Sequence, residues 1–249
     1  GGPLRVMMDR NLGATGVLYD LPTTKAQNYP TYGLFYQWGR KDPFPKASDE
    51  AGVENTETQE YTQLTYRADG TTVTDYPTLT QGPVTLAEAM RNPQTFYYDE
   101  PDSEYTDWTT ERSDALWGDG AVKSPYDPCP KGWRLAPGEA WDDFGDVWKT
   151  GNYVDAGFYK NSTWTKQDVD LGGAVYYGGT AGAVKAFYPV PGNRVYFHGA
   201  FWGVGYVGYA WSSSAVNGRG DELCFSYNKI YRHNNSERAY GCQARCIQE

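Results

Sequence analysis

The residues with the most specific chemistry in this sequence are its four cysteines and two histidines. They are Cys129, Cys224, Cys242, Cys246, His198 and His233. No two cysteines have the C-x-x-C spacing and the histidines are few, so we do not expect a zinc site. A reactive thiolate needs a basic partner, and only two histidines are available for that role. An even number of cysteines in a loop-rich chain instead predicts disulfides and an oxidising compartment.

Short motifs give no support for catalysis or for a bound cofactor. The sequence contains no nucleophile elbow, no H-E-x-x-H and no phosphate-binding loop. Residues 203–208, GVGYVG, have the glycine spacing of a dinucleotide-binding turn, but the strand-like YAWSSSA follows where that motif requires a helix. We therefore expect no catalytic residue, no cofactor and no metal ion.

Aromatic residues are the candidates for binding. The chain has 22 Tyr, 9 Trp and 9 Phe beside 29 Gly. We expect most of these rings to fill the core, but rings in glycine-flanked segments can project and stack against sugars. The predicted ligand-binding residues are Tyr177, Trp202 and Tyr206, with Arg219 and Asp221 as polar partners at an adjacent turn.

The last two residues also belong to an R-G-D tripeptide, within NGRGDE. A three-residue match is common by chance, so we expect a polar hairpin tip and not an integrin-binding loop.

Length and charge limit the classes of partner. The chain has 249 residues and a net charge of −9, from 22 basic and 31 acidic residues. An acidic chain repels phosphate backbones, so nucleic acid is not an expected partner. No apolar run approaches the ~20 residues of a transmembrane helix. We expect one domain over residues 1–249, with a long excursion at 46–125, and an export signal and further domains upstream of GGPLRV.

Hydrophobic patterns predict few helices and many short strands. An apolar strand is expected at 4–8, a short helix at 31–39, one or two helical turns at 85–91 and a turn at 113–117. Strands are expected among the aromatic runs between Gly, Asn and Pro turns, at 172–183, 186–202, 208–215, 222–233 and 238–248.

The strongest helix prediction covers residues 137–149. Trp141, Phe144 and Trp148 follow one another at spacings of three and four, which places them on one helical face. We expect these rings and Trp133 to be mostly buried against the terminal strands.

Five sequence blocks together resemble one known family. They are MDRNLGA at 8–14, YGLFYQWGRKDPF at 32–44, YDPCPKGWRLAP at 126–137, YAWSSSA at 209–215 and YGCQARCIQE at 240–249. The combination is similar to the Fibrobacter succinogenes major paralogous domain, found in exported proteins of Bacteroidetes. Many such proteins carry fimbrillin-like, pilus-associated domains upstream. The resemblance implies a cell-surface or extracellular location.

A looser resemblance is to the C-type-lectin-like fold, including its formylglycine-generating branch. It implies an α+β fold, with two short helices packed on a twisted antiparallel sheet and long ordered loops. Acidic residues cluster at 99–104, but they match neither the EPN nor the WND motif of calcium-dependent lectins. We expect a solvated acidic loop there.

This fold often joins its chain ends through a disulfide, which favours the pair Cys129–Cys246 and leaves Cys224–Cys242 as the second. The alternative pairing, Cys129–Cys242 with Cys224–Cys246, stays open. The expected function is a surface or secreted binding module for adhesion or glycans, with pilus subunits as further partners. The alternatives are an enzyme of the formylglycine-generating branch, or a structural cap of a surface assembly.

Overall fold

Strands dominate the part of the chain that the computed structural model describes. The described residues are 6–46, 65–66, 72–73, 77–100, 106–118, 122–142, 147–148, 158–160, 173–177, 184–226 and 229–249. They include two short α-helices, α1 (Lys25–Asn28) and α2 (Leu86–Arg91), and two 3₁₀ helices, η1 (Tyr29–Thr31) and η2 (Gly138–Trp141). A mostly-sheet architecture with two short helices agrees with the predicted α+β class.

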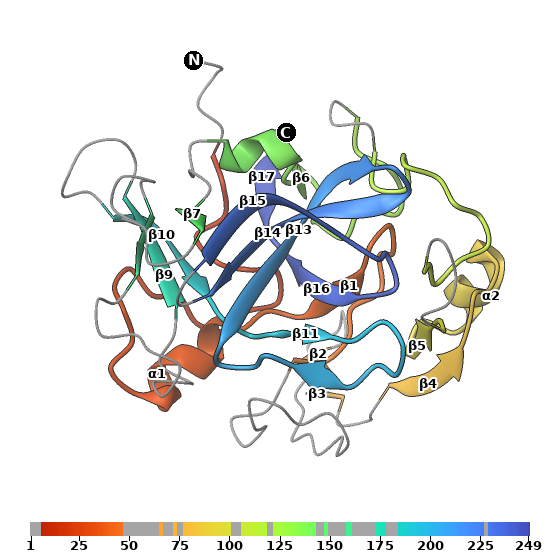
Figure 1. The fold of residues 1–249 in the computed structure, drawn as a ribbon, viewed down its shortest axis with the longest axis horizontal. Coiled ribbons are helices and arrows are strands. Elements are labelled where there is room, and N and C mark those ends of the chain that lie inside the picture. Colours follow the sequence, from red (N-terminus) through yellow and green to blue (C-terminus); the bar gives the residue numbers. More distant parts are fainter. Residues whose placement is uncertain are drawn as a thin grey trace.

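The main sheet curls through the middle of the molecule (Figure 1). Its strand order is β12-β11-β16-β13-β14-β15-β7, and β1 pairs with β16. The strands are β1 (Phe35–Gln37), β7 (Val147–Trp148), β11 (Asn193–Arg194), β12 (Phe201–Trp202), β13 (Val207–Val216), β14 (Arg219–Ser226), β15 (Lys229–Ser236) and β16 (Gly241–Ala244). All neighbours are antiparallel except β13 and β16.

The β13–β14 hairpin turns at Asn217 and Gly218. Both residues have positive φ, 52° and 78°. An Asn-Gly pair accepts this backbone and matches the twist of two adjacent strands.

Four smaller sheets complete the described fold. One has the order β10 (Val184–Pro189), β9 (Gly173–Tyr177), β8 (Phe158–Lys160); the others pair β17 (Cys246–Gln248) with β6 (Trp133–Leu135), β4 (Thr78–Gln81) with β5 (Thr95–Tyr98), and β2 (Thr65–Tyr66) with β3 (Thr72–Val73). The predicted strand at 4–8 is reduced to one bridge, Met7 to Ile247, and residues 1–5 lie outside the described part.

Opposite faces of the main sheet carry separate apolar clusters. On one face Ala210, Leu223 and Phe225 pack with Trp141 of η2. On the other, Trp211 packs with Trp38 and their neighbours. The alternation of side chains along β13 and β14 produces this division.

The Cys129–Cys246 disulfide predicted from the sequence is confirmed. The two Cα atoms are 5.9 Å apart, and the bond joins positions separated by 117 residues. Beside it, the Asp127 carboxylate accepts hydrogen bonds of 2.8 Å from the backbone N–H groups of Cys129 and Leu135. The segment around residue 129 is thereby fixed to the last strand.

The predicted helix at 137–149 is wrong. Its described beginning is only the four-residue η2, and Val147–Trp148 is strand β7, paired with Lys229 and Ile230 of β15. Pairing with β15 overrides the helical spacing of the aromatic residues. Trp141 is fully buried and Trp133 half-buried, whereas Phe144 and the side chain of Trp148 lie outside the described residues.

The predicted helix at 31–39 is also wrong. Residues 29–31 form η1 and residues 35–37 form β1, whose three side chains are all buried. A short apolar run buried on every side has no periodicity that separates helix from strand. By contrast, the helix at 85–91 is confirmed as α2, with Thr85 Oγ1 accepting from the Glu88 N–H at 3.2 Å, and the predicted turn at 113–117 is present.

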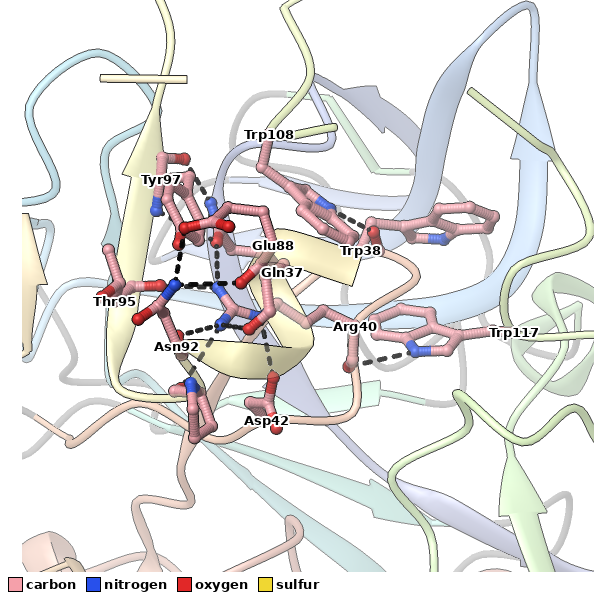
Figure 2. Close-up of polar contacts among 12 residues, drawn as sticks. Gln37, Trp38, Arg40, Asp42, Glu88, Asn92, Thr95, Tyr97, Trp108 and Trp117 are labelled. Atoms are coloured by element: carbon pink, nitrogen blue, oxygen red, sulfur yellow. Dashed lines mark hydrogen bonds and ion pairs between the residues drawn. The ribbon is translucent and has the colours of Figure 1, made fainter. Parts of the chain in front are cut away.

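Arg40 connects α2 and β5, in the predicted excursion, to β1 (Figure 2). Its buried guanidinium donates to the carbonyl oxygens of Thr95 at 2.6 Å and Asn92 at 3.0 Å and pairs with Asp42 at 3.0 Å. Part of the excursion is therefore scaffold, because a buried arginine holds it to the main sheet.

Candidate functional site

The four predicted ligand-binding residues whose side chains the structure describes do not form one site. Trp202 on β12 is 37% exposed, and Tyr206 is half-buried in the turn that follows. Arg219 and Asp221 lie at the opposite end of the β13–β14 hairpin, ~30 Å away along ten strand residues. The expectation of an adjacent turn is wrong, because those ten residues continue as one strand. The side chain of Tyr177, on β9, lies outside the described part.

The R-G-D tripeptide is part of β14 and not a displayed tip. Asp221 is 2% exposed and accepts a hydrogen bond of 2.9 Å from Ser212 Oγ. A carboxylate buried in this way cannot reach a partner protein or a ligand in solvent. The hairpin tip is formed by Asn217 and Gly218.

A different group of aromatic residues lies near the Arg219–Glu237 ion pair, and the charges of both residues act on Tyr196. We define the aromatic ledge as Tyr196, Phe197 and His198, from the β11–β12 connection, with Tyr240, from the β15–β16 connection. The Tyr196 ring contacts the Tyr240 ring edge to face at 4.8 Å between centroids and the Phe197 ring at 5.0 Å. Phe197 is 42% exposed, and the two tyrosines are half-buried.

An ion pair provides the polar groups beside the aromatic ledge. Arg219 Nη2 lies 3.0 Å from Glu237 Oε1, and the Tyr240 N–H donates to the Glu237 carbonyl at 3.0 Å. Burial and the nearby Glu237 charge raise the pKa of Tyr196 and of Tyr240. Both phenols therefore stay protonated near neutral pH, each able to donate and accept a hydrogen bond.

The backbone on either side fixes the position of the ledge. The Asp99 N–H donates to the Tyr196 carbonyl at 2.8 Å, and the Val195 N–H to the Ala200 carbonyl at 2.8 Å. Gly199 has a φ of +71°, and a Cβ atom there would lie 2.7 Å from Leu79 Cδ2. The connection bearing the aromatic residues is thus packed against β4 and held in one conformation.

The predicted Cys224–Cys242 disulfide is wrong: both cysteines are buried thiols. Cys242 is on β16 and Cys224 on β14, and β13 lies between these strands. Two strand spacings separate their backbones by ~10 Å, beyond the ~7 Å limit for a disulfide. Burial raises the pKa of Cys224 to about 12 and that of Cys242 well above its usual value, so neither is a thiolate at neutral pH.

Beside these thiols lies a fully buried acid, Glu222. Its Oε1 accepts from Asn234 Nδ2 and Ser236 Oγ, both at 2.7 Å, and its Oε2 from the Cys242 thiol at 3.3 Å. Burial raises the pKa of Glu222 to about 7, although the hydrogen bonds from Ser236 and Asn234 favour the charged form. Glu222 is a buried proton-binding group without access to a ligand.

The aromatic ledge and the role of His233 beside Asp221 were not predicted from the sequence. Tyr196, Phe197 and His198 are consecutive, and three consecutive large residues cannot all face one core. This run was the sequence signal that at least one of these rings is exposed. No such sequence signal exists for Tyr240 and Glu237, because their proximity to residue 196 depends on the pairing of β11 with β16.

Among the described residues, no three His, Cys, Asp or Glu side chains are grouped so that they could hold a metal ion. No helix in that part of the chain has the length and apolar character to cross a membrane. Comparisons of the chain with protein-family models, curated proteins and solved structures found no match.

Proposed function

We propose that this chain is an exported binding module that takes carbohydrate at the aromatic ledge. The observation that carries the proposal is the juxtaposition of the partly exposed rings of Tyr196, Phe197 and Tyr240 with the Arg219–Glu237 pair. The resemblance of its sequence blocks to exported, pilus-associated proteins supports a role in surface adhesion.

The chemistry of the ledge suits a neutral sugar. The hydrophobic face of a pyranose packs against an aromatic ring, and phenol, guanidinium and carboxylate groups exchange hydrogen bonds with hydroxyls. The charges of Arg219 and Glu237 balance each other at 3.0 Å, so the polar part of the site carries little net charge. Tyrosine and arginine also dominate the energetics of many binding surfaces.

The scaffold suits an oxidising compartment. The Cys129–Cys246 disulfide connects distant segments, and disulfides of this kind persist outside the cytosol. The remaining thiols are buried and separated by β13, which protects them from oxidation and from mispairing.

A binding role fits the titratable groups better than catalysis does. Cys224 and Cys242 have raised pKa values and are buried, which is the opposite of an activated nucleophile. The Ser212 hydroxyl donates to the Asp221 carboxylate rather than to an imidazole, so it lacks the arrangement of an activated serine.

Affinity electrophoresis in gels containing soluble neutral or acidic polysaccharides tests the proposal. We expect retardation by a neutral polysaccharide, and we expect the Tyr196→Ala, Tyr240→Ala double variant to lose it. Each stacked ring should contribute ~1–3 kcal/mol, by analogy with base stacking on aromatic side chains. Trp202→Ala is the control, since Trp202 is an exposed aromatic residue at the far end of the same β11–β12 hairpin.

The outcomes separate two binding surfaces. Retardation lost in Trp202→Ala but kept in the double variant would move the site to Trp202 and Tyr206, as the sequence predicted. The absence of retardation by every polysaccharide would contradict carbohydrate binding and favour a structural role.

A further inference from the structure

The imidazole of His233, on β15, lies between two carboxylates from different elements. Its Nε2 is 3.0 Å from Oδ1 of Asp142, the C-cap residue of η2. Its Nδ1 is 3.4 Å from both carboxylate oxygens of Asp221, on β14. Ionised carboxylates only accept hydrogen bonds, so both ring nitrogens must carry protons for both contacts to be hydrogen bonds. A neutral ring has one N–H and can keep only one of them.

The two contacts differ in what their loss would cost. Asp221 is 2% exposed, whereas the side chain of Asp142 is 56% exposed. Ser212 Oγ donates to Asp221 Oδ2, but Oδ1 is buried and has no other donor among the described residues. Leaving a buried carboxylate oxygen without a donor is far more unfavourable than leaving one that water can reach. The single proton of a neutral ring therefore stays at Nδ1, on the Asp221 side. The deprotonated Nε2 and the Asp142 carboxylate would then both be hydrogen-bond acceptors and would repel each other, so that contact must open.

The surrounding groups hold the ring and its buried partner in place. Ser212 Oγ donates to Asp221 at 2.9 Å, and a Cβ atom on Gly138 would lie 2.4 Å from Asp221 Oδ2 and 3.4 Å from the His233 ring. Only glycine therefore lets η2 approach so closely.

Among the described residues, several charged groups lie on the elements packed here, and η2 itself also carries Glu139. Besides Asp142 on η2 and Asp221 on β14, Arg232 on β15 donates from Nη1 to the Asp142 carbonyl oxygen at 2.8 Å. The neighbouring residue on β14, Glu222, belongs by strand alternation to the other face of the sheet.

We propose that Asp142, Asp221 and His233 form a pH-dependent latch that fastens the end of η2 to the sheet. With His233 protonated, both carboxylates are held and the latch is closed. With His233 neutral, Asp221 stays bound and Asp142 is released, so the last turn of η2 is free to open. The latch is independent of the proposed carbohydrate site.

The local environment favours the protonated imidazole and therefore the closed latch. Burial lowers the pKa of His233, but the hydrogen bond that the ring donates to Asp142 and the charge of Asp221 outweigh this effect and raise the pKa above 6.5. A raised histidine pKa gives a stabilising contribution that is complete below pH 6.5 and is lost as pH rises through the folded-state pKa. The latch is therefore closed below the folded-state pKa of His233 and opens as pH rises through that pKa.

The titration of the imidazole by NMR tests the latch, because the chain has only two histidines. His198→Gln assigns the two Cε1–H resonances, and burial lowers the pKa of His198, so the two midpoints should lie on opposite sides of 6.5. We expect Asp142→Asn to lower the His233 midpoint by at least about half a pH unit, since a nearby carboxylate is lost. Asp20→Asn, at another exposed acid, is the control and should leave the midpoint unchanged.

Hydrogen exchange supplies the second readout. The Asp142 N–H, which donates to the Glu139 carbonyl at 3.2 Å, should become at least about threefold less protected from pH 6 to pH 8 after correction for intrinsic exchange. That change should vanish in Asp142→Asn. A His233 midpoint at or below 6.5, a midpoint unchanged in Asp142→Asn, or pH-independent protection at η2 would each overturn the latch.

Discussion

Replacing Arg40 by methionine should destabilise the protein more than any exposed arginine would. The guanidinium donates to the carbonyl oxygens of Thr95 at 2.6 Å, Asn92 at 3.0 Å and Pro93 at 3.3 Å, and to Gln37 Oε1 at 3.2 Å. Methionine fills part of the volume and supplies none of these donors. The variant therefore isolates the polar role of the side chain from its packing.

The magnitude follows from burial. Arg40 is 2% exposed and Asp42, its ion-pair partner, only 26%, so the substitution leaves a largely buried carboxylate and several carbonyl groups without a donor. Breaking a buried ion pair from one side costs ~3–5 kcal/mol. The cation–π contact with the Phe44 ring, at 5.0 Å, is lost as well. We expect a loss of about 4 kcal/mol in the free energy of unfolding.

Urea unfolding followed by tryptophan fluorescence measures this loss. Arg91→Met is the control, because the Arg91 side chain is 74% exposed and its ion pair with Glu88, at 3.7 Å, is on the surface. The control should change the free energy by less than about 0.5 kcal/mol. A loss below about 1 kcal/mol in Arg40→Met would refute the idea that this arginine holds α2 and β5 to the sheet.

Three further variants test other parts of the fold. Trp141→Ala should cost ~3–5 kcal/mol, because Trp141 is fully buried under the sheet, and a loss below about one would make η2 peripheral. Cys129→Ala should cost ~4–5 kcal/mol in the chain-entropy model, measured by urea unfolding against wild type under non-reducing conditions, and unchanged stability would contradict it. Because the pKa of Glu222 is raised to about 7, its contribution to the free energy of unfolding is complete below pH 4.5 and is lost as pH rises through 7. From pH 6 to pH 8, the free energy of unfolding should therefore fall by about 1 kcal/mol more in wild type than in Glu222→Gln. Equal losses in the two proteins would argue against a buried proton on Glu222.

Local chemistry was predictable from the sequence where few residues decide the structure. The predicted helical segment at 85–91 and the predicted turn at 113–117 agree with the structure. The helix is fixed by a local hydrogen bond at Thr85, so the surrounding fold has little power to change it. The Cys129–Cys246 disulfide, in contrast, was favoured by the resemblance to a fold that joins its chain ends.

The errors arose where long-range pairing decides. The aromatic spacing of Trp141 and Trp148 satisfies a helix, yet Trp148 pairs with Lys229 in a ladder that no local signal reveals. Cys224 and Cys242 were predicted to form a disulfide, but they lie on β14 and β16, which are not neighbours because β13 lies between them.

The candidate site was missed for the same reason. Arg219 was predicted as a polar partner, and the structure gives it Glu237 and the aromatic ledge instead of Trp202 and Tyr206. The ledge brings together the β11–β12 and β15–β16 connections, which are about 40 residues apart in sequence and meet because β11 pairs with β16.

The measurement that tests the central claim most directly is a glycan array probed in parallel with wild type and with the Tyr196→Ala, Tyr240→Ala double variant. Circular dichroism and urea unfolding would first establish that the variant is folded. Our account predicts that wild type binds a set of neutral glycans and that the folded variant loses this set. Equal binding by the two proteins, or binding by neither, would contradict the claim that the aromatic ledge is a carbohydrate site.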